Sequence, residues 1–196
     1  GADHRHLGLE KEEELIGRGV SYCATCDGMF FRNKTVVVVG GGNSAAADAL
    51  VLSRIAKEVI LVHRRDTLRA TKIYHDALQK AANITYRWNS RIEKLRFDNV
   101  LTGVTVADVH TEKLTEIPCD GLFVAIGREP ATALFAGQLE LDSGGYIVAD
   151  ETGVTSDPAV FAAGDIRTKA LRQVVTAASD GANAVHSVEK YLAQQD

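Results

Sequence analysis

The sequence has little of several features that mark common protein classes. It holds only three cysteines in 196 residues, too few and odd in number for a secreted scaffold built on disulfides. There is no basic excess, because the formal net charge is -4, which argues against a general nucleic-acid binder. No stretch approaches the ~18 consecutive apolar residues that a transmembrane helix needs. These absences predict no nucleic-acid or membrane partner, and a reducing cytoplasm suits the few cysteines best.

The chain also lacks familiar start and repeat signals. No basic-then-apolar signal peptide opens it, and it contains no internal repeat or low-complexity segment. Gly1 to His6 include no Met and show no helix or strand pattern, so we expect the sequence to begin inside a longer protein. What is present is a composition that is 45% hydrophobic and 24% charged, which predicts a sizeable packed core.

Strand and helix patterns alternate along the first part of the chain. Buried-strand patterns at 35–39 and 58–62 are followed by helix patterns at 43–54 and 68–82. Such alternation predicts parallel β–α–β units and an α/β fold. Short strands with alternating polarity between 84 and 117 predict a small antiparallel layer.

Pro130 marks a break after another buried strand pattern at 121–126. We therefore predict one domain over residues 1–127 and a second over 128–196. In the second, the sequence predicts a strand at 159–163 and a final helix at 173–192, whose apolar residues recur at nearly helical spacing.

A glycine-rich turn lies between the first predicted strand and its helix. Gly40-x-Gly42-x-x-Ala45 supplies a tight turn, a close backbone approach for a pyrophosphate and a small residue for helix–strand packing. The helix that begins at Asn43 and Ser44 offers free N–H groups to the phosphates. The flanking pattern favours a dinucleotide site over an ordinary tight turn.

The end of the next strand indicates which dinucleotide binds. An NAD site places a carboxylate there, about 20 residues after the glycines, to accept from the ribose hydroxyl. This chain places His63, Arg64 and Arg65 there, with Arg69 following. Guanidinium groups bind a 2′-phosphate bidentately, so the sequence predicts NADP(H). A solvated basic turn is the alternative.

Cys23-x-x-Cys26 brings two sulfurs within bridging distance if the segment forms a helical turn. We interpret it as a redox-active dithiol, with Asp27 available as an acid or base for the second thiol. A zinc site is the alternative, although no second cysteine or histidine pair stands at ligand spacing. Cys119 precedes a buried strand pattern and is expected in the core.

Taken in order, these motifs resemble those of low-molecular-weight bacterial thioredoxin reductases. The resemblance rests on Cys23 to Gly28, Gly40 to Ala45, and His63 to Arg69. It extends to the stretches 121–127 and 160–165 and to Arg172-Gln173, and so covers nearly the whole chain.

The resemblance implies a flavoprotein disulfide reductase in which electrons pass from NADPH to FAD, to the Cys23–Cys26 disulfide and then to thioredoxin. It implies that Cys26 faces the flavin, that Cys23 attacks thioredoxin, and that Asp27 is the general acid/base. It also implies a homodimer for the full-length enzyme. The cofactor-binding residues it implies, beyond those already named, are Gly127, Gly164, Asp165, Arg172, Gln173 and Val174.

The sequence departs from that family in what it lacks. Family members open with a further strand, glycine-rich turn and helix that hold the ADP half of FAD, whereas this chain has a single Gly-x-Gly-x-x-Ala motif. We therefore expect a Rossmann-like, three-layer NADPH domain followed by the C-terminal part of a FAD domain. By itself, such a chain should bind NADPH, hold FAD weakly or not at all, and expose apolar surface in its second part.

Three alternatives stay open on the sequence alone. The same chemistry could serve another disulfide partner, such as that of a peroxide-reducing system. The chain could be an NADP(H)-binding module without a catalytic flavin, or a zinc-binding interaction module.

Overall fold

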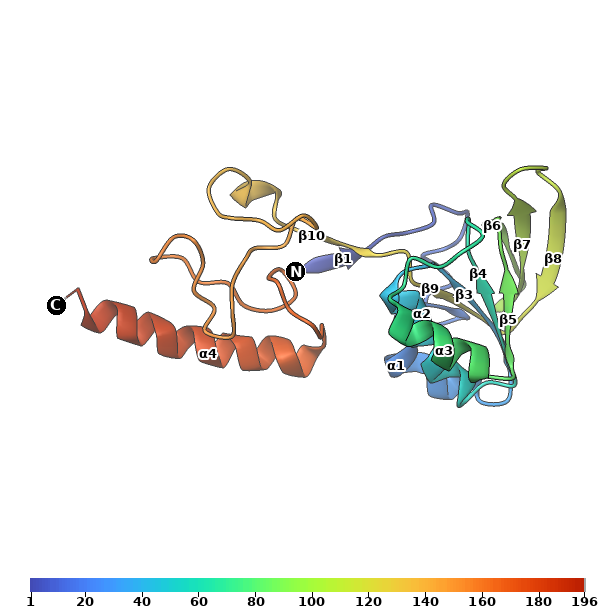
Figure 1. Ribbon diagram of the computed structural model, residues 1–196, viewed down its shortest axis with the longest axis horizontal. Coiled ribbons are helices and arrows are strands. Elements are labelled where there is room, and N and C mark those ends of the chain that lie inside the picture. The colour runs from blue at the N-terminus through green and yellow to red at the C-terminus, as the bar shows by residue number, and fades with distance from the viewer. Residues whose placement is uncertain (196) are drawn as a thin grey trace. The chain divides into compact units, whose positions relative to one another are not determined.

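A computed structural model describes residues 1–195, which form two compact units (Figure 1). The larger unit spans Arg5–Gly127. The smaller unit combines Gly1–His4 with the chain from Arg128 onwards.

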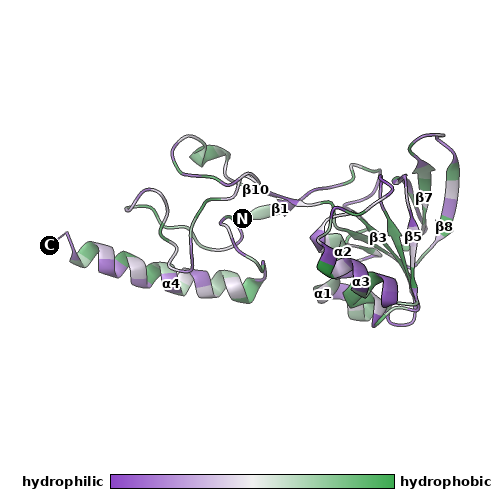
Figure 2. Cartoon of the chain, viewed as in Figure 1, coloured by the Kyte–Doolittle hydropathy of each residue, from purple (hydrophilic) through white to green (hydrophobic). Residues whose placement is uncertain are grey.

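The larger unit is built on a five-stranded parallel sheet with the strand order β2-β9-β3-β4-β5. Its strands are β2 (Val20–Ser21), β3 (Thr35–Val39), β4 (Glu58–Val62), β5 (Ile84–Arg87) and β9 (Gly121–Val124). β3 is a run of valines and the sheet's middle strand, which suits a strand buried on both faces (Figure 2).

Helices cover one face of this sheet (Figure 1). They are α1 (Ala24–Asp27), the 3₁₀ turn η1 (Gly28–Phe31), α2 (Asn43–Ser53) and α3 (Lys72–Lys80). α2 turns its small residues Ala45, Ala46 and Ala49 to the sheet, all fully buried, so the helix packs closely against β3 and β4.

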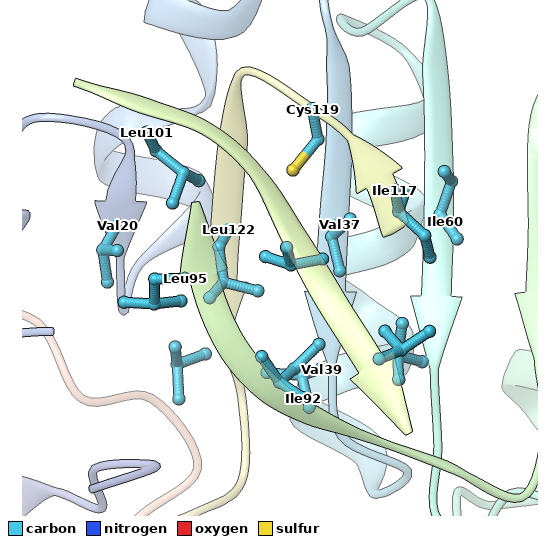
Figure 3. Close-up of a cluster of buried hydrophobic side chains, with 14 of the residues drawn as sticks. Val20, Val37, Val39, Ile60, Ile92, Leu95, Leu101, Ile117, Cys119 and Leu122 are labelled. Carbon is cyan, nitrogen blue, oxygen red and sulfur yellow. The ribbon is translucent and has the colours of Figure 1, made fainter. Parts of the chain in front are cut away.

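A three-stranded antiparallel sheet covers the opposite face. It consists of β6 (Ser90–Phe97), β7 (Leu101–Asp108) and β8 (Leu114–Pro118). Figure 3 shows Leu95 and Ile117 from this layer packed against Val37 and Leu122 of the parallel sheet. The larger unit therefore has the three layers expected of a Rossmann-like dinucleotide-binding fold.

The smaller unit has little regular structure. β1 (Ala2–His4) and β10 (Arg128–Pro130) form a two-stranded antiparallel ladder, followed by the 3₁₀ turn η2 (Ala133–Phe135) and the long helix α4 (Val174–Ala193). As expected, this unit exposes apolar side chains, with Val174, Val185 and Leu192 on α4 each more than half exposed.

Several predicted boundaries differ from the structure. Gly1–His4, assigned to the first domain by sequence, pair instead with β10 in the smaller unit. The predicted strand at 159–163 is wrong, because Phe161 forms only an isolated bridge to Val154 and no strand ladder runs along it in the described chain. The strand β5 belongs to the parallel sheet rather than to the antiparallel layer.

Two further elements begin or end at other residues than predicted. The predicted helix at 68–82 begins only at Lys72, because the N–H groups of Arg69 and Ala70 donate to Gly41 O and hold that segment as a loop. β9 ends at Val124, two residues before the predicted end. Among the described residues, no helix is long and apolar enough to span a membrane.

Candidate functional site

Four neighbouring strands of the parallel sheet end at residues predicted to be functional. In the order β2-β9-β3-β4, these strands are followed by Cys23, Gly127, Gly40 and His63. Parallel strands end at the same edge, where ligands bind in open α/β sheets. The fold thus places the dithiol segment and the dinucleotide motif along one edge of one sheet.

The two motif glycines have different surroundings. Gly40 has φ +148°, and a side chain there would collide with the carbonyl oxygen of Ala125 and with Ala45. Gly42 is the N-cap of α2, and a Cβ there would meet nothing within 4 Å. The first glycine is therefore required by the fold, whereas the second leaves open space at a helix N-terminus, which fits an approaching phosphate.

The loop after β4 is fixed onto this turn. Arg69 N–H donates to Gly41 O at 2.7 Å, and Thr71 N–H donates to Asn43 Oδ1 at 2.8 Å. Ser44 remains exposed in the first turn of α2. These contacts carry the arginine-bearing segment to the glycine turn.

The ring of His63 lies against Gly41 of the glycine turn, and 5% of the residue's surface is exposed. Burial lowers its pKa, and the nearby guanidinium groups of Arg69, Arg65 and Arg64 lower it further, so the ring is neutral at pH 7. Its Nε2 atom is buried and has no hydrogen-bond partner among residues 1–195. The three arginines are exposed and form no ion pair within the described chain.

A basic cluster of this kind fits a phosphorylated ligand. Within residues 1–195 the guanidinium groups form no ion pair with a carboxylate, and a 2′-phosphate would supply the opposite charge. The site therefore has the open turn, the helix N-terminus and the cations that NADPH requires.

Cys23 and Cys26 form a disulfide with an S–S distance of 2.06 Å and a Cα–Cα distance of 5.3 Å. Cys23 is the N-cap of α1, and its Sγ accepts a hydrogen bond from Cys26 N–H at 3.1 Å. Cys26 is exposed and Cys23 is half-buried. The single helical turn expected from the spacing therefore does bring the sulfurs together, where a partner can reach them.

Asp27 follows the disulfide at the end of α1 and is half-buried. Its Oδ2 accepts a hydrogen bond of 2.7 Å from Ser21 Oγ. A carboxylate next to a dithiol can take or give the proton that thiol–disulfide exchange moves.

A buried carboxylate also secures the segment before β2. Glu12 is 3% exposed and accepts backbone N–H bonds from Leu7 and Gly8 at 2.9 and 2.8 Å. Tyr22, next to Cys23, donates its hydroxyl proton to Glu12 at 2.6 Å. Burial and this carboxylate raise the pKa of Tyr22.

Cys119 is buried in the core, as predicted, and it is not disulfide-bonded. Burial raises the pKa of its thiol to about 12, so it stays protonated and unreactive at neutral pH. Residues 1–195 contain no group of three side chains arranged to hold a metal ion.

The remaining predicted residues gather in the smaller unit. Asp165 Oδ1 is buried without a hydrogen-bond partner in the described chain, while Oδ2 accepts from Arg128 at 3.3 Å. Such an unsatisfied acceptor fits a ligand hydroxyl, as the ribityl chain of FAD would supply. Gly164 has φ +83° and donates its N–H to Asp180. It therefore shapes the turn, and its N–H is not free to donate to a ligand.

Arg172, Gln173 and Val174 lie at the start of α4. The Arg172 guanidinium stacks on the Tyr146 ring at 3.9 Å and reaches the carbonyl of Asp165 at 3.5 Å. Gln173 is the N-cap of α4, and Val174 is 87% exposed. The structure therefore brings Arg172 next to Asp165 and leaves Val174 open to a ligand.

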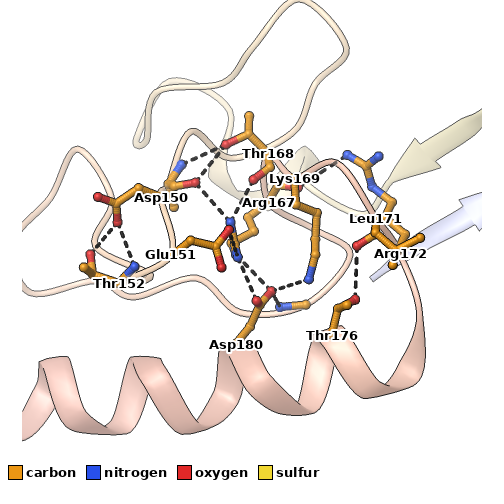
Figure 4. Close-up of polar contacts among 12 residues, drawn as sticks. Asp150, Glu151, Thr152, Arg167, Thr168, Lys169, Leu171, Arg172, Thr176 and Asp180 are labelled. Atoms are coloured by element: carbon orange, nitrogen blue, oxygen red, sulfur yellow. Dashed lines mark hydrogen bonds and ion pairs between the residues drawn. The ribbon is translucent and has the colours of Figure 1, made fainter.

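Sequence reasoning missed the polar network that holds this loop. Asp180, 4% exposed, accepts from Arg167 at 2.7 and 2.9 Å, from Lys169 at 2.7 Å and from Gly164 N–H at 2.9 Å (Figure 4). These donors hold the pKa of Asp180 far below its ordinary value. No local pattern marks such residues, because their burial depends on contacts 11 to 16 residues apart.

Comparison with known proteins matches this chain to one family. Residues 1–181 match the family model described as pyridine nucleotide-disulphide oxidoreductase. The chain is 49% identical over 192 residues to a thioredoxin reductase of Treponema pallidum, covering 98% of this chain and 62% of that protein. It is also 47% identical to a thioredoxin reductase of Streptomyces clavuligerus, covering 98% of this chain and 60% of that protein.

Solved structures give the same result. A thioredoxin reductase of Streptococcus pyogenes matches with a TM-score of 0.90 at 41% identity, covering 99% of this chain and 64% of that one. That of Giardia duodenalis matches with a TM-score of 0.92 at 36% identity. The chain thus spans about 60% of the length of the curated relatives it matches.

Proposed function

Because the chain belongs to the pyridine nucleotide-disulphide oxidoreductase family, we propose that it acts in an NADPH-dependent disulfide reductase whose protein substrate is thioredoxin. The observation that carries this proposal is the shared sheet edge, where an accessible Cys23–Cys26 disulfide follows β2 and the glycine-and-arginine site follows β3 and β4. The names of the relatives support thioredoxin as the partner.

NADPH would be held by the glycine turn and the basic cluster. Gly42 leaves space for the pyrophosphate at the start of α2, where Asn43, Ser44 and Ala45 follow. Arg64, Arg65 and Arg69 would bind the 2′-phosphate. His63 would support the glycine turn, and Gly127, which follows β9 beside β3, would complete the site.

FAD is the second cofactor of this family. When bound, it would supply two-electron transfer between the nicotinamide and a disulfide. In this chain Asp165 would accept a ribityl hydroxyl, and Gly164 would form the turn that presents it. Arg172, Gln173 and Val174 would border the flavin ring.

The dithiol would act by thiol–disulfide exchange. The Cys23 thiolate attacks the partner's disulfide, forming a mixed disulfide and releasing one partner thiolate. Cys26 then attacks Cys23 Sγ, which restores the Cys23–Cys26 bond and releases the second partner thiolate. The proton that leaves Cys26 passes to Asp27.

We further propose a homodimer and a cytoplasmic location for the protein in which this chain works. The few cysteines, with one redox-active pair and one buried thiol, support a reducing compartment. Analytical ultracentrifugation of the full-length protein would test the dimer.

Trapping tests the proposed role of each sulfur. A Cys26→Ser chain should form a stable mixed disulfide through Cys23 with a thioredoxin variant that keeps only its attacked cysteine, activated as the thionitrobenzoate mixed disulfide, because thionitrobenzoate then leaves and no second thioredoxin thiol can reverse the exchange. Peptide mass spectrometry identifies the linkage. A Cys23→Ser chain is the matched control and should trap far less. A linkage through Cys119, or equal trapping by both variants, would contradict the assignment.

A further inference from the structure

We propose that Ser21 is a positioning residue for the dithiol, whose buried hydroxyl orients Asp27 to receive the proton released when the disulfide closes. The proposal rests on the proposed function, because it takes Asp27 as the base in that step.

Ser21 lies on the strand that precedes the dithiol turn and is buried. It is the last residue of β2, pairs with Phe123 of β9, and is 2% exposed. Its Oγ lies 2.7 Å from Asp27 Oδ2 and accepts Cys23 N–H at 3.1 Å. One hydroxyl therefore joins the start of the dithiol turn to the carboxylate at its end.

The single hydroxyl proton goes to the carboxylate. Ser21 Oγ is also 3.4 Å from Cys23 O, but the bond to the charged Asp27 is shorter and stronger. This arrangement occupies only one oxygen of Asp27. Oδ1 has no hydrogen bond within residues 1–195, so it remains available for a proton.

Few other ionisable groups surround this arrangement. α2, which packs against α1, carries Asp48 alone, and neither η1 nor β2 carries any. Tyr22 is bound to Glu12 and to His6. Asp27 is therefore the carboxylate that lies on the same helical turn as the dithiol.

The role predicts a pH signature. An ordinary thiol has a pKa of about 8.5, so closure by a thiol at pH 6 needs a well-placed base, whereas at pH 9 a thiolate forms without one. Loss of the Ser21 hydroxyl should therefore slow closure at low pH and leave it nearly unchanged at high pH.

The test uses the reduced chain and the aromatic disulfide DTNB. The first chain sulfur breaks the reagent's S–S bond and releases one coloured thiolate. The second sulfur then closes the Cys23–Cys26 bond, releases the second thiolate and gives up its proton. Stopped-flow absorbance separates the two releases, and buried Cys119 stays silent.

We expect Ser21→Ala to slow the second release about tenfold at pH 6 and less than about twofold at pH 9, as the loss of one hydrogen bond to a charged group allows. Ser21→Thr, which keeps the hydroxyl, should stay within twofold of the parent chain. Asp27→Asn should slow the second release at least as much as Ser21→Ala. Circular dichroism of each variant monitors folding.

The outcomes separate this inference from the proposed function. If Asp27→Asn is slow while Ser21→Ala matches the parent, or is slowed equally at every pH, the role of Ser21 is overturned alone. If Asp27→Asn closes as fast as the parent, the acid–base role of Asp27 fails, and the role of Ser21 fails with it.

Discussion

Arg64 and Arg65 illustrate what single residues contribute to the nucleotide site. Both are exposed, neither has an ion-pair partner in the described chain, and both contribute to lowering the pKa of the buried His63. Their positive charge is thus concentrated at the end of β4, where it forms no ion pair within the described chain that would stabilise the fold. Unpaired surface charges of this kind contribute little to stability and are suited to binding an anion.

Replacing these two arginines should change nucleotide preference. We expect Arg64→Ala with Arg65→Ala to raise the NADPH dissociation constant by about two orders of magnitude, since each charge-assisted contact contributes roughly 1.5 kcal/mol. The NADH constant should change less than twofold. Calorimetric titration measures both, with Arg54→Ala as an exposed-arginine control; equal effects on NADPH and NADH would exclude a 2′-phosphate site.

Alanine substitutions at the two motif glycines should have different effects on stability and on NADPH binding. Gly40→Ala should lower the free energy of unfolding by more than about 2 kcal/mol, because its φ is +148° and its side chain would meet backbone. Gly42→Ala should cost less than about 1 kcal/mol but weaken NADPH binding at least tenfold by filling the phosphate space. Urea unfolding measures the stability of both variants, and NADPH titration measures their binding. A Gly40→Ala chain as stable as the parent would contradict the prediction for Gly40.

At the scale of elements, α4 is secured by a buried ion network rather than by an apolar face. Asp180 and Ala184 are the only buried residues of α4 within its described length, and Asp180 ties the helix to Arg167, Lys169 and Gly164. Removing one partner of such a network leaves the others buried and uncompensated.

Asp180→Asn should therefore destabilise the smaller unit by about 3–5 kcal/mol. Hydrogen exchange of peptides from 160–192 measures this, with the exposed Glu189→Gln as a control on the same helix. Unchanged protection would show that the network does not hold α4.

The same network predicts that the smaller unit loses stability at low pH. The pKa of Asp180 is lower in the folded chain than the value of about 3.9 expected when unfolded, so its stabilisation is complete above that pH and is lost as pH falls below it. Exchange in 160–192 should increase below about pH 4 in the parent chain and not in Asp180→Asn.

Sequence patterns predicted the regular elements well where local signals were strong. Periodicity and turn chemistry were enough to predict β3 with its run of valines, β4, and the helix α2 that follows the glycine turn. The start of α3 could not be predicted, since it depends on Gly41 O capturing Arg69 N–H across the turn. Ser21 carries no local mark, because its role depends on a two-residue strand, β2, defined by pairing with β9.

For the whole molecule, the two units differ in how far sequence could describe them. The larger unit buries two apolar clusters on opposite faces of one sheet, and that pattern is visible along the chain. The smaller unit has one small cluster around Leu139 and Ile147, and is otherwise held by turns and ions. The strand predicted at 159–163 is wrong, because Phe161 forms only an isolated bridge to Val154.

On the function proposed above, the Cys23–Cys26 pair exchanges two electrons with thioredoxin. The most direct test mixes the reduced chain with an equal amount of oxidised thioredoxin and counts free thiols on each protein by alkylation and mass spectrometry. We predict that Cys23 and Cys26 become oxidised as thioredoxin becomes reduced, with Cys119 unchanged. Thioredoxin that stays oxidised beside a reduced Cys23–Cys26 pair, while dithiothreitol reduces the same sample, would contradict the claim.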